Sequence, residues 1–242
     1  MKYTYCEAAM WHIMMPAAFR YLAETNSDWD IPALKRRAKQ IYRQIVSRTP
    51  DIGSMMNNPL RVCMTGGMLW LSVFEAAEGH MSEECFEGMV NASMKTPLVQ
   101  KSYRNKTKIA FTLKAQKKLM ASAARTDAVE NPFQWDAEII LGRDAEEYTI
   151  LYHQCGLCAL GRQEGLFHLV PYMCALDTMS IDWMGGVLYR AKTLAAGGDC
   201  CDLYIRKKKS KWDIEHKKEN HHAENYSTSR RNDVRDVRKP CE

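Results

Sequence analysis

The period of the hydrophobic pattern changes near Asn131-Pro132, and this change restricts the folds that the chain can adopt. Before this point, apolar residues recur every three or four positions, as on one face of an amphipathic helix. Directly after it, residues 135–141 alternate between apolar and other side chains, which is a strand pattern. A chain whose helices come first and whose strands come later is typical of an α+β domain.

The first 130 residues are predicted to be helical. Helices are expected over 5–23 with a kink or break at Pro16, over 32–45, over a buried run at 68–74, after an N-cap at Ser82, and over 107–124. In the last of these, Ile109, Leu113, Met120 and Ala123 are expected to face inward. Lys114, Lys117 and Lys118 then face water, and we interpret them as a solvated face rather than a nucleic-acid site.

The second half of the chain is predicted to form a sheet. Strands are expected near 135–141, 147–153, 187–194 and 200–206, with a helix over 169–184 between the second and third. Turn residues at Gly142 and at Gly197-Gly198 favour hairpins. The predicted fold is therefore α+β: a helical N-terminal half packed on a mainly antiparallel β-sheet, with short helices inserted between strands.

The positive charge of the chain is concentrated at its C-terminus. Of the 34 Lys and Arg and the 29 Asp and Glu, 12 and 7 follow Ile205, which leaves 22 of each in the rest of the chain. A balanced body predicts no specific nucleic-acid partner. We expect one domain over 1–206 and a basic, disordered tail over 207–242, whose removal should leave the melting temperature nearly unchanged.

The apolar runs are too short for a bilayer, which needs about 20 residues. His12 and Pro16 interrupt the N-terminal apolar clusters, so these clusters indicate a helix rather than a signal peptide. We therefore expect no membrane partner and a cytoplasmic location. The 9 cysteines are then expected to stay reduced and to serve metal binding, catalysis or packing.

Reactive side chains are concentrated between His153 and Asp202. Cys155 and Cys158 form a C-x-x-C pair, which is half of a zinc-ligand pattern, and His153 and Cys174 are candidates to complete it. A second C-x-x-C or H-x-x-x-H pair is missing. We expect no cofactor, and zinc, a redox pair and a reduced, partly buried pair remain as alternatives for these two thiols.

Further along this segment, Cys174 and Asp177 are three positions apart and would share one face of a helix. With His153 as a base, Cys174 is a candidate nucleophile; the alternative is a core cysteine beside a carboxylate that bonds the backbone. Arg190 lies in a predicted strand, and if it faces inward it needs a carboxylate partner. That partner could be Asp177, Asp202 or a carboxylate on a substrate.

The order of these residues resembles the L-2-amino-thiazoline-4-carboxylic acid hydrolase family. The resemblance rests on Cys155, on Cys174-x-x-Asp177, and on Arg190-x-x-Thr-Leu-Ala-x-Gly-Gly-Asp-x-Cys-Asp202, and it covers about residues 1–206 with its specific signal in 146–206. Cys200 is an extra cysteine beside the family's Cys-Asp pair, and Leu203 replaces a phenylalanine.

The resemblance implies hydrolysis of a C–N or C–S bond in a cyclic amidine, 2-aminothiazoline-4-carboxylate, on a route to cysteine. It implies that Arg190 binds the substrate carboxylate, Asp177 binds the amidine or activates water, and Cys174 attacks the ring carbon, with His153 as proton shuttle. Cys155 and Asp202 would complete a substrate pocket between the sheet and the 169–184 helix.

A second similarity is to vinyl-reductase-type small-molecule-binding domains, through the glycine-rich hairpin and the strand that follows it. It implies a module that senses or carries a ligand without turning it over. A zinc-bound structural domain is the third reading. All but the third assume a small-molecule ligand, and the oligomeric state is left open.

Overall fold

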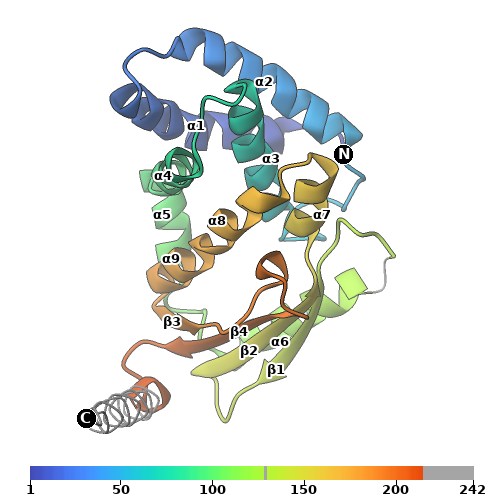
Figure 1. Ribbon diagram of the computed structural model, residues 1–242. Helices are drawn as coiled ribbons and strands as arrows, with labels where there is room; N and C mark the ends of the chain where they lie inside the picture. Colours follow the sequence, from blue (N-terminus) through green and yellow to red (C-terminus); the bar gives the residue numbers. More distant parts are fainter. Residues whose placement is uncertain (128–129, 215–242) are drawn as a thin grey trace, which may run out of the picture.

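The computed structural model describes residues 1–127 and 130–214 (Figure 1). The helices of the first half are α1 Tyr5–Thr25, α2 Ile31–Arg48, α3 Arg61–Ala76, α4 Glu83–Met94, α5 Pro97–Arg104 and α6 Leu113–Asp127. The second half contains β1 Asp136–Leu141, β2 Glu147–Gln154, α7 Gly156–Gln163, η1 Phe167–Leu169, α8 Val170–Cys174, α9 Leu176–Trp183, β3 Gly186–Tyr189, η2 Leu194–Ala196 and β4 Cys201–Lys207.

The N-terminal helices begin where side chains can cap them. Thr4 and Glu7 form a reciprocal capping box at the start of α1, and this helix continues through Pro16 instead of breaking there. Ser82 caps α4, as predicted, by accepting a hydrogen bond from the backbone N–H of Cys85. The apolar stripe of α1, including Trp11 and Leu22, is buried in the main core.

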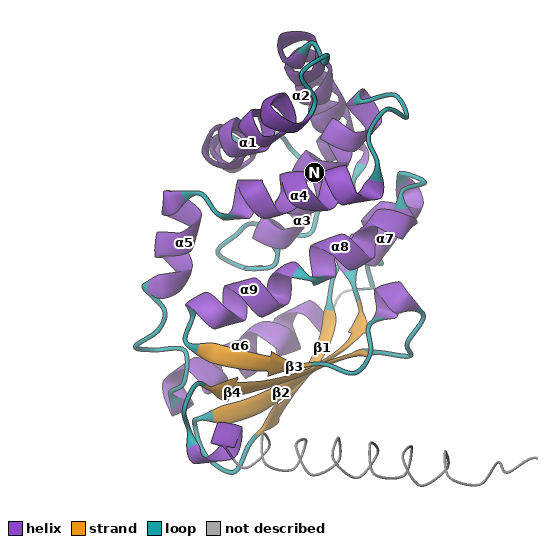
Figure 2. Cartoon of the chain, turned by 60° about the vertical axis from the view of Figure 1, so that its left-hand side comes forward, coloured by secondary structure: helices purple, strands orange, loops and turns teal. Residues whose placement is uncertain are grey.

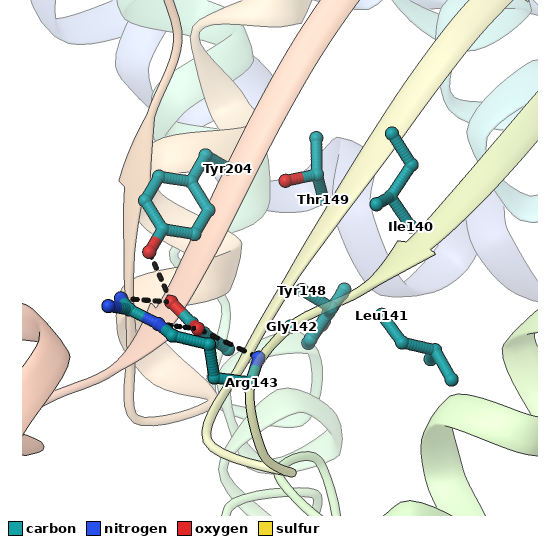
Figure 3. A pocket seen from close by; sticks show the side chains of 8 residues that line it. Ile140, Leu141, Gly142, Arg143, Tyr148, Thr149 and Tyr204 are labelled. Atoms are coloured by element: carbon teal, nitrogen blue, oxygen red, sulfur yellow. Dashed lines mark hydrogen bonds and ion pairs between the residues drawn. The ribbon is translucent and has the colours of Figure 1, made fainter.

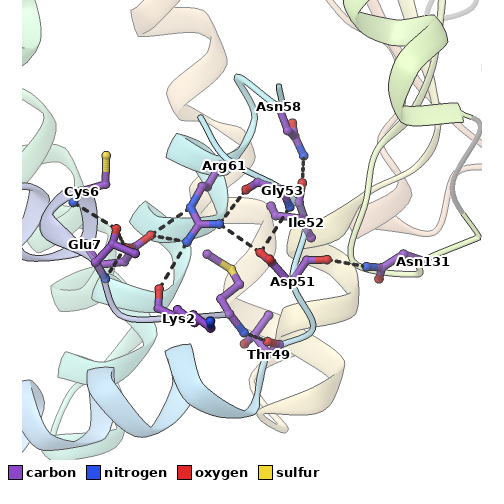
Figure 4. A network of polar contacts seen from close by, with 12 residues as sticks. Lys2, Cys6, Glu7, Thr49, Asp51, Ile52, Gly53, Asn58, Arg61 and Asn131 are labelled. Carbon is purple, nitrogen blue, oxygen red and sulfur yellow. Dashed lines mark hydrogen bonds and ion pairs between the residues drawn. The ribbon is translucent and has the colours of Figure 1, made fainter. Parts of the chain in front are cut away.

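A buried ion pair joins α1 to α3 (Figure 4). Arg61 donates to Glu7 at 2.8 Å and to the carbonyl oxygen of Gly53 at 2.6 Å, and only 6% of Arg61 is exposed. Burial raises the pKa of Glu7, but hydrogen bonds from Thr4 and Arg61 outweigh it, and the net pKa is lowered. The guanidinium therefore connects the first helix, the loop before α3 and α3 itself.

The described residues form an antiparallel sheet of 4 strands in the order β1-β2-β4-β3. Strand β4 pairs with both β2 and β3, with Ile150 opposite Leu203 and Leu188 opposite Ile205. Consecutive strands therefore pair at both ends of the sheet, and the last strand inserts between β2 and β3. The predicted α+β fold with an antiparallel sheet is confirmed.

One face of the sheet is covered by helices. Side chains that alternate along β2 and β4, such as Ile150 and Leu203, pack with Ile181 of α9 and with Leu119 and Ala123 of α6. Figure 2 shows α8 and α9 between the N-terminal helices and the sheet. This intermediate layer brings the segment after β2 and the segment after β3 close to the helical half.

The helix predicted over 107–124 begins later, at Leu113, and turns precede it. Of the four residues expected to face inward, Ile109, Leu113 and Met120 are 59%, 60% and 40% exposed, whereas Ala123 does pack against the sheet. The buried position is Gln116, whose side chain donates to the backbone carbonyl of Glu147. Packing of α6 against the sheet, with an amide that satisfies a buried carbonyl, accounts for which side of the helix turned inward. The sequence pattern also missed α5.

The helix predicted over 169–184 is interrupted. The η1 turn, α8 and α9 replace it, and Pro171 lies in the first turn of α8. The strand predicted over 187–194 ends at Tyr189, so Arg190 lies just beyond it. Gly197 has a φ of +85°, which explains a glycine at this turn.

The packed body extends past Arg206, beyond the predicted domain boundary. Asp213 is only 1% exposed and accepts a hydrogen bond from the Tyr189 hydroxyl. Trp212 donates through its indole to Asp144. Residues 207–214 therefore belong to the folded body, which corrects this part of the tail prediction; residues 215–242 lie outside the described residues. Within residues 1–127 and 130–214, none of the helices combines the length and the apolar character that a membrane-spanning segment needs.

Candidate functional site

A carboxylate and a guanidinium lie side by side where α8, α9 and β3 meet. Arg190 donates through Nη1 to Asp177 Oδ2 at 2.9 Å and to the carbonyl oxygen of Cys174 at 3.1 Å. Cys174 and Asp177, which were expected to share one face of a helix, lie on either side of the break between α8 and α9. Arg190 therefore connects the end of α8 to α9 and orients the Asp177 carboxylate.

Asp177 is accessible to water and yet deep in the body. Its side chain is 45% exposed, whereas that of Arg190 is 18% exposed. Burial raises the pKa of Asp177 to about 6, although the charge and the hydrogen bond of Arg190 act to lower it. The loss of hydration is therefore the larger of the two effects on this carboxylate. The group therefore changes its charge close to neutral pH.

Thiols and phenols from both halves of the chain surround this carboxylate. Burial is the main cause that raises the pKa of Cys63, Cys174, Cys201, Tyr103 and Tyr152, and the negative charge of Asp177 adds to it. The same charge also acts on Cys155, whose net pKa is nevertheless lowered. Cys63, Tyr103 and Tyr152 come from α3, α5 and β2. They were missed by sequence reasoning, because isolated Cys and Tyr residues in apolar helices and strands look like core positions.

Cys155 occupies the N-cap position of α7. Hydrogen bonds from the Cys158 thiol and from the backbone N–H groups of Cys158 and Leu157 lower the pKa of Cys155, although burial and Asp177 act in the opposite direction. A glycine follows at 156 because a Cβ there would lie 2.3 Å from the carbonyl oxygen of Phe133. Close packing thus fixes where α7 begins and where the Cys155 thiol lies.

The other thiols of the cluster are held as neutral S–H groups. Burial raises the pKa of Cys174 to about 12, and the nearby charges of Cys155 and Asp177 add to this effect. The pKa of Cys158 is raised because its thiol donates to Cys155 and because it is buried. Cys155 is therefore the member of this cluster whose surroundings favour a thiolate.

Two predicted site residues lie outside the cluster. The His153 imidazole points to Glu138 on β1, at 3.6 Å, and the His153 side chain is 47% exposed. It alternates with Tyr152 along β2, so it lies on the opposite face of the sheet. The Asp202 carboxylate accepts hydrogen bonds from the backbone N–H groups of Ala191 and Lys192, which is a structural role in shaping the loop after β3.

The structure does not assemble the zinc set considered from the sequence. Cys155, Cys158 and Cys174 lie together, but His153 faces away from them. Within residues 1–127 and 130–214, no three His, Cys, Asp or Glu side chains are placed to hold one metal ion. The 8 cysteines in these ranges are free thiols.

A separate depression of about 390 Å³ lies near the β1–β2 turn (Figure 3). Its polar wall is a network in which Arg143 and Tyr204 both donate to Glu147. Its other lining residues include Ile140 and Thr149. It contains none of the site residues predicted from the sequence.

Together, the fold and the site define an α+β protein in which a water-accessible carboxylate–guanidinium pair is surrounded by thiols. Residues 63–205 match the family model described as L-2-amino-thiazoline-4-carboxylic acid hydrolase. The match spans more than half of the chain, so the protein belongs to this family. It begins at Cys63 and ends within β4, and it includes every residue of the cluster around Asp177. Searches of the curated proteins and of the solved structures gave no significant match.

Proposed function

We propose that this protein hydrolyses a small cyclic amidine that carries a carboxylate, such as 2-aminothiazoline-4-carboxylate. The observation that carries the proposal is the Asp177–Arg190 pair, with its 2.9 Å contact, beside a cluster of thiols. A protonated aminothiazoline with a carboxylate is a zwitterion. An adjacent anion and cation on the protein match the two charges of such a molecule. The family match supports the reaction class.

The free edge of Arg190 suits the substrate carboxylate. Both hydrogen bonds that Arg190 makes to described residues use Nη1. Its Nε and Nη2 donors therefore remain for a ligand, and these two donors form the edge that binds carboxylates bidentately. The Asp177 carboxylate, held by the same guanidinium, then faces the amidine.

Cys155 is the proposed nucleophile, in place of Cys174. Its thiolate adds to the amidine carbon, and the electron pair of the C=N bond moves to nitrogen. The adduct collapses with cleavage of a ring C–S or C–N bond, and the leaving heteroatom takes a proton. Water then attacks the same carbon and releases the Cys155 thiolate, so the cycle consumes one water. A cationic amidine on Asp177 would offset the repulsion between Asp177 and the Cys155 thiolate.

Replacing each candidate thiol by serine tests this assignment. Cys155→Ser should reduce turnover of 2-aminothiazoline-4-carboxylate by at least about a thousand-fold, because a hydroxyl supplies almost no anion at neutral pH. Cys174→Ser is the matched control and should retain turnover within about ten-fold, since its thiol is held neutral. Chromatography measures the loss of substrate over time, and circular dichroism checks that each variant is folded.

The reverse pattern, with Cys174→Ser inactive and Cys155→Ser active, would return the nucleophile to Cys174. Tight binding of the thiazoline by the wild-type chain without turnover would instead favour a non-catalytic ligand-binding module. The cytoplasm remains the expected compartment, because a thiolate nucleophile requires reducing surroundings.

A further inference from the structure

We propose that Cys155 and Cys158 form a reversible disulfide by exchange with small disulfides, and that Cys158 is the resolving thiol. This bond would be a reversible modification of the protein. The expected loss of activity on oxidation rests on the proposed role of Cys155 as nucleophile. The formation of the bond itself does not depend on that role.

The position of the two residues on α7 brings their sulfur atoms together. Cys155 is the N-cap and Cys158 lies in the first turn, where the backbone N–H of Ala159 donates to the Cys155 carbonyl at 3.2 Å. Residues three apart on a helix have Cβ atoms about 5–6 Å apart, whereas a disulfide needs about 3.5–4.5 Å, so the first turn of α7 must tighten by about 1–2 Å to form the bond. The two thiols interact directly with each other, so the bond would join sulfur atoms that are already neighbours.

The two thiols differ in access, as a nucleophilic and a resolving cysteine must. Cys155 is partly exposed, whereas Cys158 is buried, with 3% of its surface exposed. Cys155 is therefore the more accessible of the two thiols to a small disulfide in solution. The orientation of Cys155 at a helix N-terminus also favours the thiolate, which is the species that attacks a disulfide.

Exchange proceeds in two balanced steps. The Cys155 thiolate attacks one sulfur of a small disulfide such as glutathione disulfide, forming a mixed disulfide and releasing one thiolate. Cys158 then loses its proton and attacks the Cys155 sulfur, which releases the second small thiolate. The protein dithiol loses two electrons and two protons in total, and the small disulfide is reduced to two thiols.

Cys174 is the competing partner. Its charge state interacts with both thiols of the pair, so it lies near them. However, it ends α8 and its own carbonyl is fixed by Arg190, so a Cys155–Cys174 bond would require two elements to move. A bond within the first turn of α7 requires neither.

Peptide mass mapping of the full-length protein tests the proposal. Trypsin should release residues 144–162 as one peptide that contains Cys155 and Cys158 and no other cysteine. After treatment with glutathione disulfide and alkylation of free thiols, this peptide should lack both alkyl groups and two hydrogen atoms. Dithiothreitol should restore alkylation at both positions, and thiazoline turnover should fall and recover in parallel.

Two variants distinguish the outcomes. In Cys158→Ser the mixed disulfide should persist, so the 144–162 peptide should carry one glutathione on Cys155. Cys174→Ser, the matched control, should still form the internal bond. Alkylation of both thiols after oxidation, or a cross-link between peptides containing Cys155 and Cys174, would overturn the proposal. Disulfide formation without any turnover in the reduced protein would overturn the proposed function alone.

Discussion

At the residue scale, one carboxylate determines the character of the site. Asp177 binds Arg190 and lies close to thiols of the cluster, and its pKa of about 6 lies close to neutral pH. Because the pKa is raised above the ordinary aspartate value, the charged form predominates only above about pH 6 and is lost as the pH falls through that value. Binding of a cationic amidine requires the charged form.

This predicts an acid limb in the activity profile. The kcat/KM for 2-aminothiazoline-4-carboxylate should fall about ten-fold per pH unit below about 6, which reports the free-enzyme ionisation. Asp177→Asn should lose this limb and lower kcat/KM over the whole range, whereas Asp182→Asn on the same helix is a surface control. A limb that persists near pH 6 in Asp177→Asn would assign the ionisation to another group.

At the scale of elements, the Glu147 carboxylate stabilises the turn between β1 and β2 and also connects this turn to β4. Arg143 follows Gly142 in the turn and donates to Glu147 at 2.7 Å. Tyr204 donates to the same carboxylate from β4. The hydrogen bonds from Arg143 are the main cause that lowers the pKa of Glu147 to about 2, although burial opposes this.

The sign of this shift predicts a stability effect. Because the folded-state pKa lies below the unfolded value of about 4.3, the stabilisation is complete above that pH and is lost as the pH falls towards about 2. Glu147→Gln should lower the free energy of unfolding by about 1–3 kcal/mol at pH 7, and by less at pH 3. Urea denaturation measures both values. Glu146→Gln, which removes only a surface pair with Lys207, should change them by less than about 1 kcal/mol.

At the scale of the whole molecule, the chain after β4 completes the fold. Arg206 is 1% exposed, stacks on the Tyr189 ring at 3.7 Å, and donates through Nη1 to the carbonyl of Trp212. Ending the chain at Arg206 removes this acceptor and also the buried Asp213. An unpaired buried cation is costly, so the segment 207–214 should contribute to stability.

Two truncations test this. A chain that ends at Arg206 should have a melting temperature at least about 5 °C lower than the full chain, because a loss of about 2 kcal/mol produces such a shift at this size. A chain that ends at Ile214 should melt within about 2 °C of the full chain. For residues 215–242 we therefore still expect that their removal leaves the melting temperature nearly unchanged. Equal melting temperatures for all three chains would show that 207–214 contribute nothing measurable.

The sequence alone determined the fold class and supplied the candidate residues for the site. Hydrophobic periods set the helical first half and the strands, and turn residues set antiparallel pairing, because both are local properties of the backbone. The cluster of Cys155, Cys174, Asp177 and Arg190 was also found, because these residues lie close together in the chain.

Only the tertiary structure decided which groups meet. In the folded chain, His153 lies on the sheet face opposite to Tyr152, and Asp202 accepts backbone hydrogen bonds. Cys63 and Tyr103, from helices far away in sequence, lie near Asp177. The tertiary structure also distinguished Cys155 from Cys174, because the pKa of a thiol depends on neighbouring donors, charges and burial that no residue pattern contains. Spacing identifies the reactive groups, whereas packing determines their charge and their partners.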